Sequence, residues 1–200
     1  MLETATLATL DRLTAALGAQ LLVEVRWRGA DLDRLVDRLH AAIQDQTATK
    51  LARLGWMVQP EVSFNHFGDR GSCDLVALHP GAQALLVVEV KSRLGDVQDT
   101  LRRLDTKARL GPMLAEQLGW PRPRLVGRAL VFGEHRTTRR LVAGHEALFG
   151  GFSLRGASAR RWLRAPSGPA QRLLWFESLP DSRQVRTKRP DRAVHRHPAG

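Results

Sequence analysis

The sequence is poor in features that would each mark a particular class of protein. Cys73 is the single cysteine among 200 residues, which excludes an internal disulfide and makes the reducing cytoplasm the simplest location to expect. No apolar run approaches the roughly 20 residues that a membrane span needs. The first residues carry Glu3 in place of a basic cluster and lead to no apolar block, which argues against a secretory signal. We therefore expect no membrane partner.

Acidic residues are few relative to basic ones. The chain has 31 Lys and Arg side chains against 20 Asp and Glu, a formal net charge of +11. Residues 181–200 hold six of the basic and two of the acidic side chains, so residues 1–180 are strongly basic by themselves. Positive charge spread through the chain favours a polyanionic partner over a membrane surface, with an Arg-rich composition as the alternative explanation.

The hydrophobic pattern predicts one α/β domain between two extensions. Residues 1–30 are expected to form a helix and a strand, residues 31–180 the domain, and residues 181–200 a disordered basic tail. The helix over 96–118 is expected to break near Gly111-Pro112. Residue periods predict helices over 31–54, 96–118, 138–149 and 157–163, and strands over 56–64, 72–79, 84–92, 125–132 and 172–176.

Two acidic residues stand out on strands that are otherwise apolar. If residues 80–83 connect the strands over 72–79 and 84–92, Asp74 and Glu89 are equidistant from the centre of the turn. They would then be direct cross-strand neighbours, roughly 5 Å apart at Cβ and on one face. Lys91 shares the face of Glu89, because side chains alternate along a strand. Like charges this close require a shared proton or a divalent cation between them.

Oxygen ligands favour Mg²⁺ or Mn²⁺ over zinc, which prefers His and Cys. A hard cation held by few carboxylates keeps positions open for water and for a phosphate oxygen. It lowers the pKa of an attacking water, while Lys91 stabilises charge that develops on the phosphate. The residues therefore indicate hydrolysis of phosphodiester bonds.

The sequence has Asp74, then fourteen residues, then Glu89-Val90-Lys91. This pattern resembles the signature of the PD-(D/E)XK phosphodiesterase superfamily, which has the restriction-endonuclease-like fold. The resemblance implies a mixed central sheet flanked by helices, with an αβββαβ core over about residues 31–132. It assigns metal binding to Asp74 and Glu89 and a catalytic role to Lys91. Many members add an acid from the first core helix, for which Asp45 is the best-placed candidate. Some members use a glutamine on the helix after the motif, where Gln98 stands.

A second resemblance covers more of the chain. Actinobacterial proteins in which a helix-turn-helix domain precedes a nuclease-like domain carry similar stretches. Residues 1–19, which precede the region of similarity, are too few for such a domain. We therefore expect a nuclease-like part without this domain, either because the protein omits it or because the start of the sequence is truncated. The similar stretches are residues 26–35, 64–72, 97–109 and 161–164.

Basic side chains on two predicted helices are candidates for contacts with DNA phosphates. Arg102 and Arg109 share one helix face, and Arg160 and Arg161 belong to a second basic segment. A solvated helix face is the alternative for each of them. The sequence thus predicts a Mg²⁺- or Mn²⁺-dependent DNA endonuclease. The alternative is a non-catalytic DNA-binding or regulatory module on the same fold, and the sequence leaves open whether two copies form a homodimer.

Overall fold

The computed structural model describes residues 6–19, 21, 23, 30–92 and 95–178. Within the helix that begins at Ala30, side chains are described from residue 34 onward. The chain divides into two compact units, residues 1–34 and residues 35–200. The first unit contains helix α1 (Leu7–Ala16). The expected strand near residues 22–28 lies mostly outside the described residues, and the expected disordered tail, residues 181–200, lies wholly outside them.

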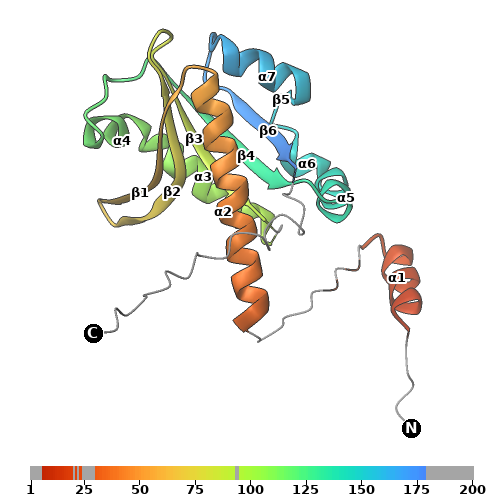
Figure 1. The fold of residues 1–200 in the computed structure, drawn as a ribbon. Helices are drawn as coiled ribbons and strands as arrows, with labels where there is room; N and C mark the ends of the chain where they lie inside the picture. The colour runs from red at the N-terminus through yellow and green to blue at the C-terminus, as the bar shows by residue number, and fades with distance from the viewer. Residues whose placement is uncertain (1–5, 20, 22, 24–29, 93–94, 179–200) are drawn as a thin grey trace, which may run out of the picture. The chain divides into compact units, whose positions relative to one another are not determined.

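The second unit is built on a mixed six-stranded sheet (Figure 1). The strand order is β1-β2-β3-β4-β6-β5. The β1–β2 and β2–β3 pairs are antiparallel, whereas the pairs that join β3, β4, β6 and β5 are parallel. This confirms the predicted α/β class with a mixed sheet flanked by helices. The strands are β1 (Met57–His66), β2 (Asp69–His79), β3 (Ala84–Lys91), β4 (Leu125–Gly133), β5 (Leu154–Arg155) and β6 (Arg172–Glu177).

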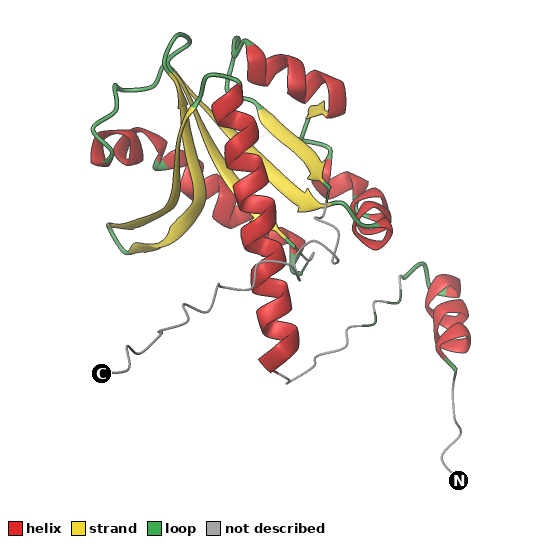
Figure 2. Ribbon diagram, in the orientation of Figure 1, coloured by secondary structure: helices red, strands yellow, loops and turns green. Residues whose placement is uncertain are grey.

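Helices cover both faces of this sheet, as Figure 2 shows. Along the chain, α2 precedes the three antiparallel strands, and α3 and α4 connect β3 to β4. The predicted break near Gly111-Pro112 is confirmed, since α3 ends at Arg109 and α4 begins at Gly111. The helices are α2 (Ala30–Arg53), α3 (Val97–Arg109), α4 (Gly111–Gln117), α5 (Arg136–Gly144), α6 (Glu146–Phe149) and α7 (Gly156–Arg164). None of the helices in the described ranges is both long and apolar enough to cross a bilayer.

Two hydrophobic clusters lie on opposite sides of β3. Leu85 and Val87 pack with α3 and α4 in one cluster, and Val88 and Val90 pack with α2 and α7 in the other. Every residue from Ala84 to Val90 is buried, which suits a central strand covered on both faces. This burial makes the charged residues at the end of β3 exceptional.

The β1–β2 hairpin differs from the expectation for this segment. The sequence suggests a loop between residues 64 and 72, but both strands continue through it and His66 pairs with Asp69. Only Phe67 and Gly68 form the turn, with φ values of 45° and 89°. The prediction was wrong because a Phe-Gly pair lacks the usual signature of a two-residue turn, in which Asn or Asp precedes Gly.

β1 forms one edge of the sheet and contains two irregular positions. Pro60 has no N–H to donate, and Glu61 has a φ of 52° in the left-handed region. On β2 the alternation of faces also breaks next to these positions, because Cys73 joins the cluster of Val76 and Leu78. Cys73 is fully buried there and packs as a small hydrophobic residue.

The C-terminal part of the domain follows the predicted order with shifted boundaries. The helix expected over 138–149 is divided into α5 and α6 at His145. The short strand β5 was missed, since two residues carry no periodic pattern. The basic helix expected over 157–163 is present as α7, and the last strand is present as β6.

Candidate functional site

Three carboxylate residues occupy one row across the adjacent strands β1, β2 and β3. The β1–β2 register places Glu61 opposite Asp74, and the β2–β3 register places Asp74 beside Glu89, one position beyond the last pair of that ladder. We call these three residues the carboxylate row. The register predicted from the 80–83 connection is confirmed. The flanking pairs are Pro60 with Leu75, Val62 with Cys73, and Leu75 with Val88.

Asp74 is held at the point where β2 and β3 separate. Its Oδ2 accepts a hydrogen bond of 2.6 Å from the backbone N–H of Val90. The Nε2 of His40 on α2 lies 3.8 Å from the same oxygen. The other oxygen, Oδ1, accepts no hydrogen bond from any residue in the described ranges, and the side chain is 15% exposed. Asp74 thus presents one carboxylate oxygen with unused lone pairs at the end of the sheet.

Gln44 joins Asp74 to the first member of the row. Its side-chain amide donates a hydrogen bond of 2.7 Å to Oε1 of Glu61 and one of 2.8 Å to the backbone carbonyl of Asp74. Both amide hydrogens are therefore used, which fixes the orientation of a nearly buried polar side chain. Helix α2 is in this way tied to the two strands at the row itself.

Glu89 lies deeper and is neutralised by two lysines. The Nζ of Lys91 is 2.7 Å from Oε1, and the Nζ of Lys107 on α3 is 2.5 Å from Oε2. The Glu89 and Lys107 side chains are 6% and 11% exposed, whereas Lys91 is 32% exposed. Lys91 therefore has access to solvent and to a ligand, while Lys107 is held within the fold.

Burial and charge shift the two strand carboxyl groups in opposite directions. Burial and the neighbouring charge of Glu89 raise the pKa of Asp74 above its ordinary value of 3.8, against the opposing effect of the Val90 N–H. Burial alone would also raise the pKa of Glu89, but Lys107 and Lys91 hold this pKa below its ordinary value of 4.5. Of these two carboxyl groups, Asp74 is therefore the one whose negative charge the fold compensates less.

Asp74→Asn is expected to unfold with a larger free energy than wild type at neutral pH. Because the folded pKa of Asp74 lies above 3.8, wild type loses stability as the pH rises from 3.8 through the folded value. Asparagine keeps an acceptor for the Val90 N–H and carries no charge. The advantage should vanish below pH 3.8, where folded and unfolded wild type are both protonated. Urea unfolding across this pH range measures the difference, and a variant less stable at pH 7 would contradict it.

The two remaining candidates for catalysis or metal binding lie apart from this row. Asp45 on α2 is exposed and lines a cavity with Lys50 and Glu177, and none of the interactions that hold Asp74 or Glu89 involves it. A one-residue step turns a helix by about 100°, so Gln44 and not Asp45 faces the strands. Gln98 on α3 is exposed and makes no side-chain contact with the row. Asp45 and Gln98 remain predictions from the sequence, and on the same two helices the residues that contact the row are Gln44 and Lys107.

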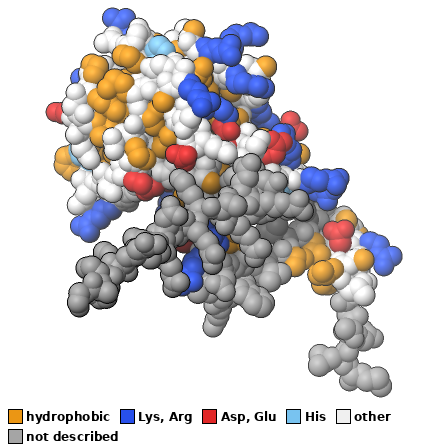
Figure 3. Space-filling view, in the orientation of Figure 1, with side chains coloured by type: hydrophobic (Ala, Val, Ile, Leu, Met, Phe, Trp, Pro, Cys, Tyr) orange, Lys and Arg blue, Asp and Glu red, His pale blue; other side chains and the backbone are white. Residues whose placement is uncertain are grey.

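The four candidate DNA-binding arginines are all exposed. Arg102 pairs with Asp99 within α3, and Arg109 lies 3.1 Å from Asp69 on β2. Arg160 and Arg161 lie on α7 and have no ion-pair partner among the residues described. Figure 3 shows basic side chains gathered on the surface where α7 lies.

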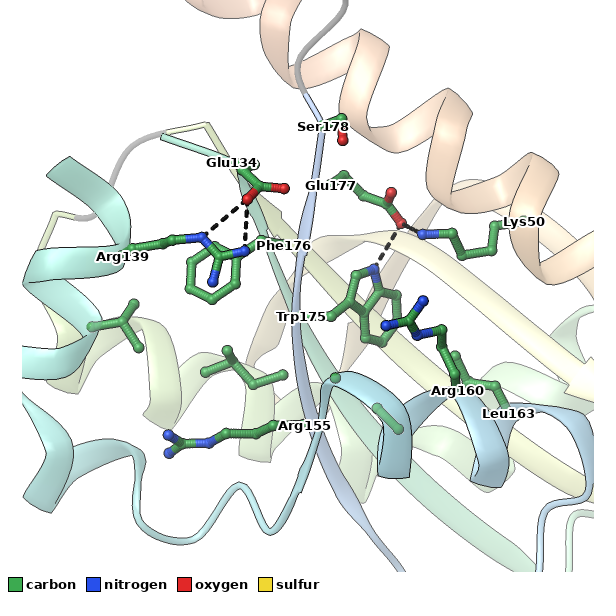
Figure 4. Close-up of a pocket in the computed structure, with 14 residues that line it drawn as sticks. Lys50, Glu134, Arg139, Arg155, Arg160, Leu163, Trp175, Phe176, Glu177 and Ser178 are labelled. Carbon is green, nitrogen blue, oxygen red and sulfur yellow. Dashed lines mark hydrogen bonds and ion pairs between the residues drawn. The ribbon is translucent and has the colours of Figure 1, made fainter. Parts of the chain in front are cut away.

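A second polar group lies near the carboxyl ends of β4 and β6 (Figure 4). It lines a cavity of about 540 Å³. Lys50 forms an ion pair with Glu177, and Arg139 donates a hydrogen bond of 2.6 Å to Oε1 of Glu134. Arg160 also lines this cavity. Both acids of this group are thus paired with bases.

Four residues of the candidate site were not identified from the sequence. His40, Gln44 and Glu61 surround Asp74, and Lys107 reaches Glu89 from α3. Glu61 belongs to a strand, and the pairing of β1 with β2 places it in the row. The spacing of His40 and Gln44, one helical turn apart, was the available signal for the helix face.

The donor set fits a hard divalent cation. Asp74 offers a free carboxylate oxygen beside the charge of Glu89, and Mg²⁺ is usually bound by one or two carboxylates with several waters. In the described part of the chain, no three His, Cys, Asp or Glu side chains gather closely enough to hold a metal ion. Both oxygens of Glu89 are paired with lysines, so Asp74 is the acid of the two that presents an unpaired carboxylate oxygen.

These observations define an α/β protein with a mixed six-stranded sheet flanked by helices and a lysine-supported pair of acids at the end of its central strands. The chain matches no protein-family model and is similar to no curated protein.

Proposed function

We propose that this protein hydrolyses DNA phosphodiester bonds with Mg²⁺ or Mn²⁺ and belongs to the PD-(D/E)XK phosphodiesterases that its sequence resembles. One observation carries the proposal: Asp74 and Glu89 lie side by side in the β2–β3 register, and Lys91 contacts Glu89. The order α2, three strands, α3 and α4, and β4 supports it. A cytoplasmic location, where Cys73 remains a thiol, is part of the same proposal.

Each of the three residues has a role that follows from its surroundings. Asp74 and Glu89 would hold the cation, which polarises the phosphate and lowers the pKa of the attacking water. Lys91 is the exposed partner of Glu89, so its ammonium group has access to a phosphate oxygen. There it stabilises the negative charge that develops as the P–O bond breaks. Lys107 keeps Glu89 ionised and fixed, and so acts as a positioning residue.

Arginines on two helices supply the affinity for the DNA backbone in this proposal. Arg102 and Arg109 on α3 and Arg160 and Arg161 on α7 are exposed and contact phosphates. Contacts of this kind release counterions, so DNA binding weakens steeply as salt rises.

One observation favours the alternative, a non-catalytic DNA-binding or regulatory module. Both oxygens of Glu89 are occupied by lysines, as in a purely structural ion triad. In such a protein the acids and lysines would stabilise the fold, and the basic surface alone would bind DNA.

The purified full chain is expected to cut DNA with Mg²⁺ or Mn²⁺ and to leave it intact with EDTA. The assay uses single-stranded, duplex and branched DNA, and fluorescence anisotropy in EDTA measures binding at several salt concentrations. Cation-dependent cleavage supports the proposal. Salt-dependent binding without cleavage of any substrate supports the module instead, and a chain that neither binds nor cuts DNA contradicts both.

A further inference from the structure

The turn of the β1–β2 hairpin carries an aromatic side chain where the fold gains little from one. Phe67 is 96% exposed, the largest exposed fraction of any large apolar side chain in the described ranges. Its backbone has a φ of 45°, and that of Gly68 is 89°. Two successive positive values define a type I′ turn, for which Asn followed by Gly is preferred. A phenylalanine here therefore carries both backbone strain and exposed apolar surface.

Within the described fold, the aromatic contact made by Phe67 is with a neighbour in the chain. The His66 and Phe67 rings meet edge to face, with centroids 4.4 Å apart. This contact supports the ring from one side and leaves it open to solvent. The turn lies at the lower end of the β1–β2 hairpin, at the left of the sheet in Figure 1. An exposed, strained aromatic residue in such a place suits a contact with another molecule.

Basic side chains line a cavity beside the turn of this hairpin. This cavity of about 360 Å³ is lined by four of them, with Asp69 as its single acidic residue. Among the described residues, Arg102 and Arg103 pair with Asp99, and Lys107 pairs with Glu89. The side chain of Arg70, three residues beyond the turn position of Phe67, has no ion-pair or hydrogen-bond partner among the described residues. The hydroxyl of Ser72, also in the lining, is buried and has no hydrogen-bond partner in the described part of the chain. The basic residues are Arg70, Arg102, Arg103 and Lys107.

The same cavity leads to the carboxylate row. Lys107 lines it and pairs with Glu89. A polyanion bound along this cavity would therefore extend from the aromatic turn toward the acids proposed to hold the cation. This continuity favours nucleic acid over a protein surface as the partner of Phe67.

We propose that Phe67 is a DNA-binding residue that stacks on a base of bound DNA, while Arg70 contacts a neighbouring phosphate. The inference rests on the proposed function for the identity of the partner. Aromatic side chains stack on any base, and each such contact adds about 10-fold or more to affinity. Arg70 adds charge instead, so the two residues contribute in distinguishable ways.

Four variants of the full chain test this proposal by anisotropy with DNA in EDTA. Phe67→Ala and Phe67→Asn are expected to weaken binding by about 10-fold or more with an unchanged salt slope, and Phe67→Trp to retain it. Arg70→Ala is expected to reduce the slope of log K against log salt by about 1. A 2-aminopurine base in the DNA should show a change in fluorescence on binding that Phe67→Ala abolishes.

Protein folding and DNA binding respond differently to Phe67→Asn. The substitution creates the Asn-Gly pair that the turn prefers, so the melting temperature should rise by about 2–4 °C while DNA binding falls. A purely structural role for Phe67 would not separate the two readouts in this way. Met57→Ala, which removes another exposed apolar side chain from the opposite end of β1, is the matched control and should bind DNA as wild type does.

The outcomes separate this inference from the proposed function. If wild type binds and cuts DNA but Phe67→Ala binds equally well, the inference is wrong and the proposed function stands. If wild type binds no DNA at low salt, both are wrong. If Phe67→Ala leaves DNA affinity unchanged but converts a dimer to a monomer in sedimentation, Phe67 contacts a second copy of the chain and the inference is overturned.

Discussion

Asp74→Asn is expected to slow cation-dependent DNA cleavage by about 1,000-fold or more. An amide lacks the negative charge that binds a hard divalent cation, and such a cation contributes several kcal/mol to catalysis. Each 1.36 kcal/mol corresponds to a factor of ten in rate. The asparagine retains an acceptor for the Val90 N–H, so the strands should keep their arrangement. Single-turnover cleavage of labelled DNA measures the rate.

Two comparisons show whether this loss arises at the cation. Glu116→Gln alters an exposed carboxylate on α4 and should cut DNA at the wild-type rate. Asp74→Asn should bind DNA in EDTA as wild type does, because the proposed phosphate contacts come from the arginines on α3 and α7. Lys91→Ala should likewise bind DNA but cut it slowly. Full cleavage by Asp74→Asn would place any nuclease activity elsewhere in the molecule.

Glu89→Ala is expected to lower the free energy of unfolding by about 3–5 kcal/mol. It leaves Lys107, whose side chain is 11% exposed, without a counterion in the protein interior. Lys91 is affected less, since it is 32% exposed and can be solvated. Urea unfolding at pH 7, followed by circular dichroism, measures the change.

Asp105 provides a matched control for this prediction. It also holds two basic side chains, Arg128 and Arg172, but it is 47% exposed. Asp105→Ala should therefore cost less than about 1 kcal/mol. A double variant, Glu89→Met with Lys107→Met, should regain much of the stability because no buried charge remains uncompensated. Equal losses for Glu89→Ala and Asp105→Ala would show that burial of the Glu89 pair has little energetic effect.

Local patterns in the sequence were sufficient for the central part of the site. The turn over 80–83 fixes the pairing of β2 with β3, and two-residue alternation then brings Lys91 to the side of Glu89. Both are short-range rules. The order of helices and strands around this hairpin followed from the same periodicities.

The rest of the site depends on contacts between distant segments. Glu61 enters the row through the pairing of β1 with β2, whose turn at Phe67 has no recognisable signature. Lys107 reaches Glu89 through the packing of α3, which no spacing rule specifies. On α2 the choice between Gln44 and Asp45 required the rotation of the helix to within one residue, beyond the resolution of a hydrophobic stripe.

The irregular backbone of β1 has a consequence for the association of this protein with itself. An exposed, regular edge strand invites strand addition by another chain, the first step of many aggregates. Here Pro60 offers no donor and Glu61 turns the backbone away from a ladder, while the opposite edge, β5, is only two residues long. Neither edge is a template for intermolecular β-structure. If the proposed binding to DNA concentrates copies of this basic chain, these edges would oppose fibre-like growth among them.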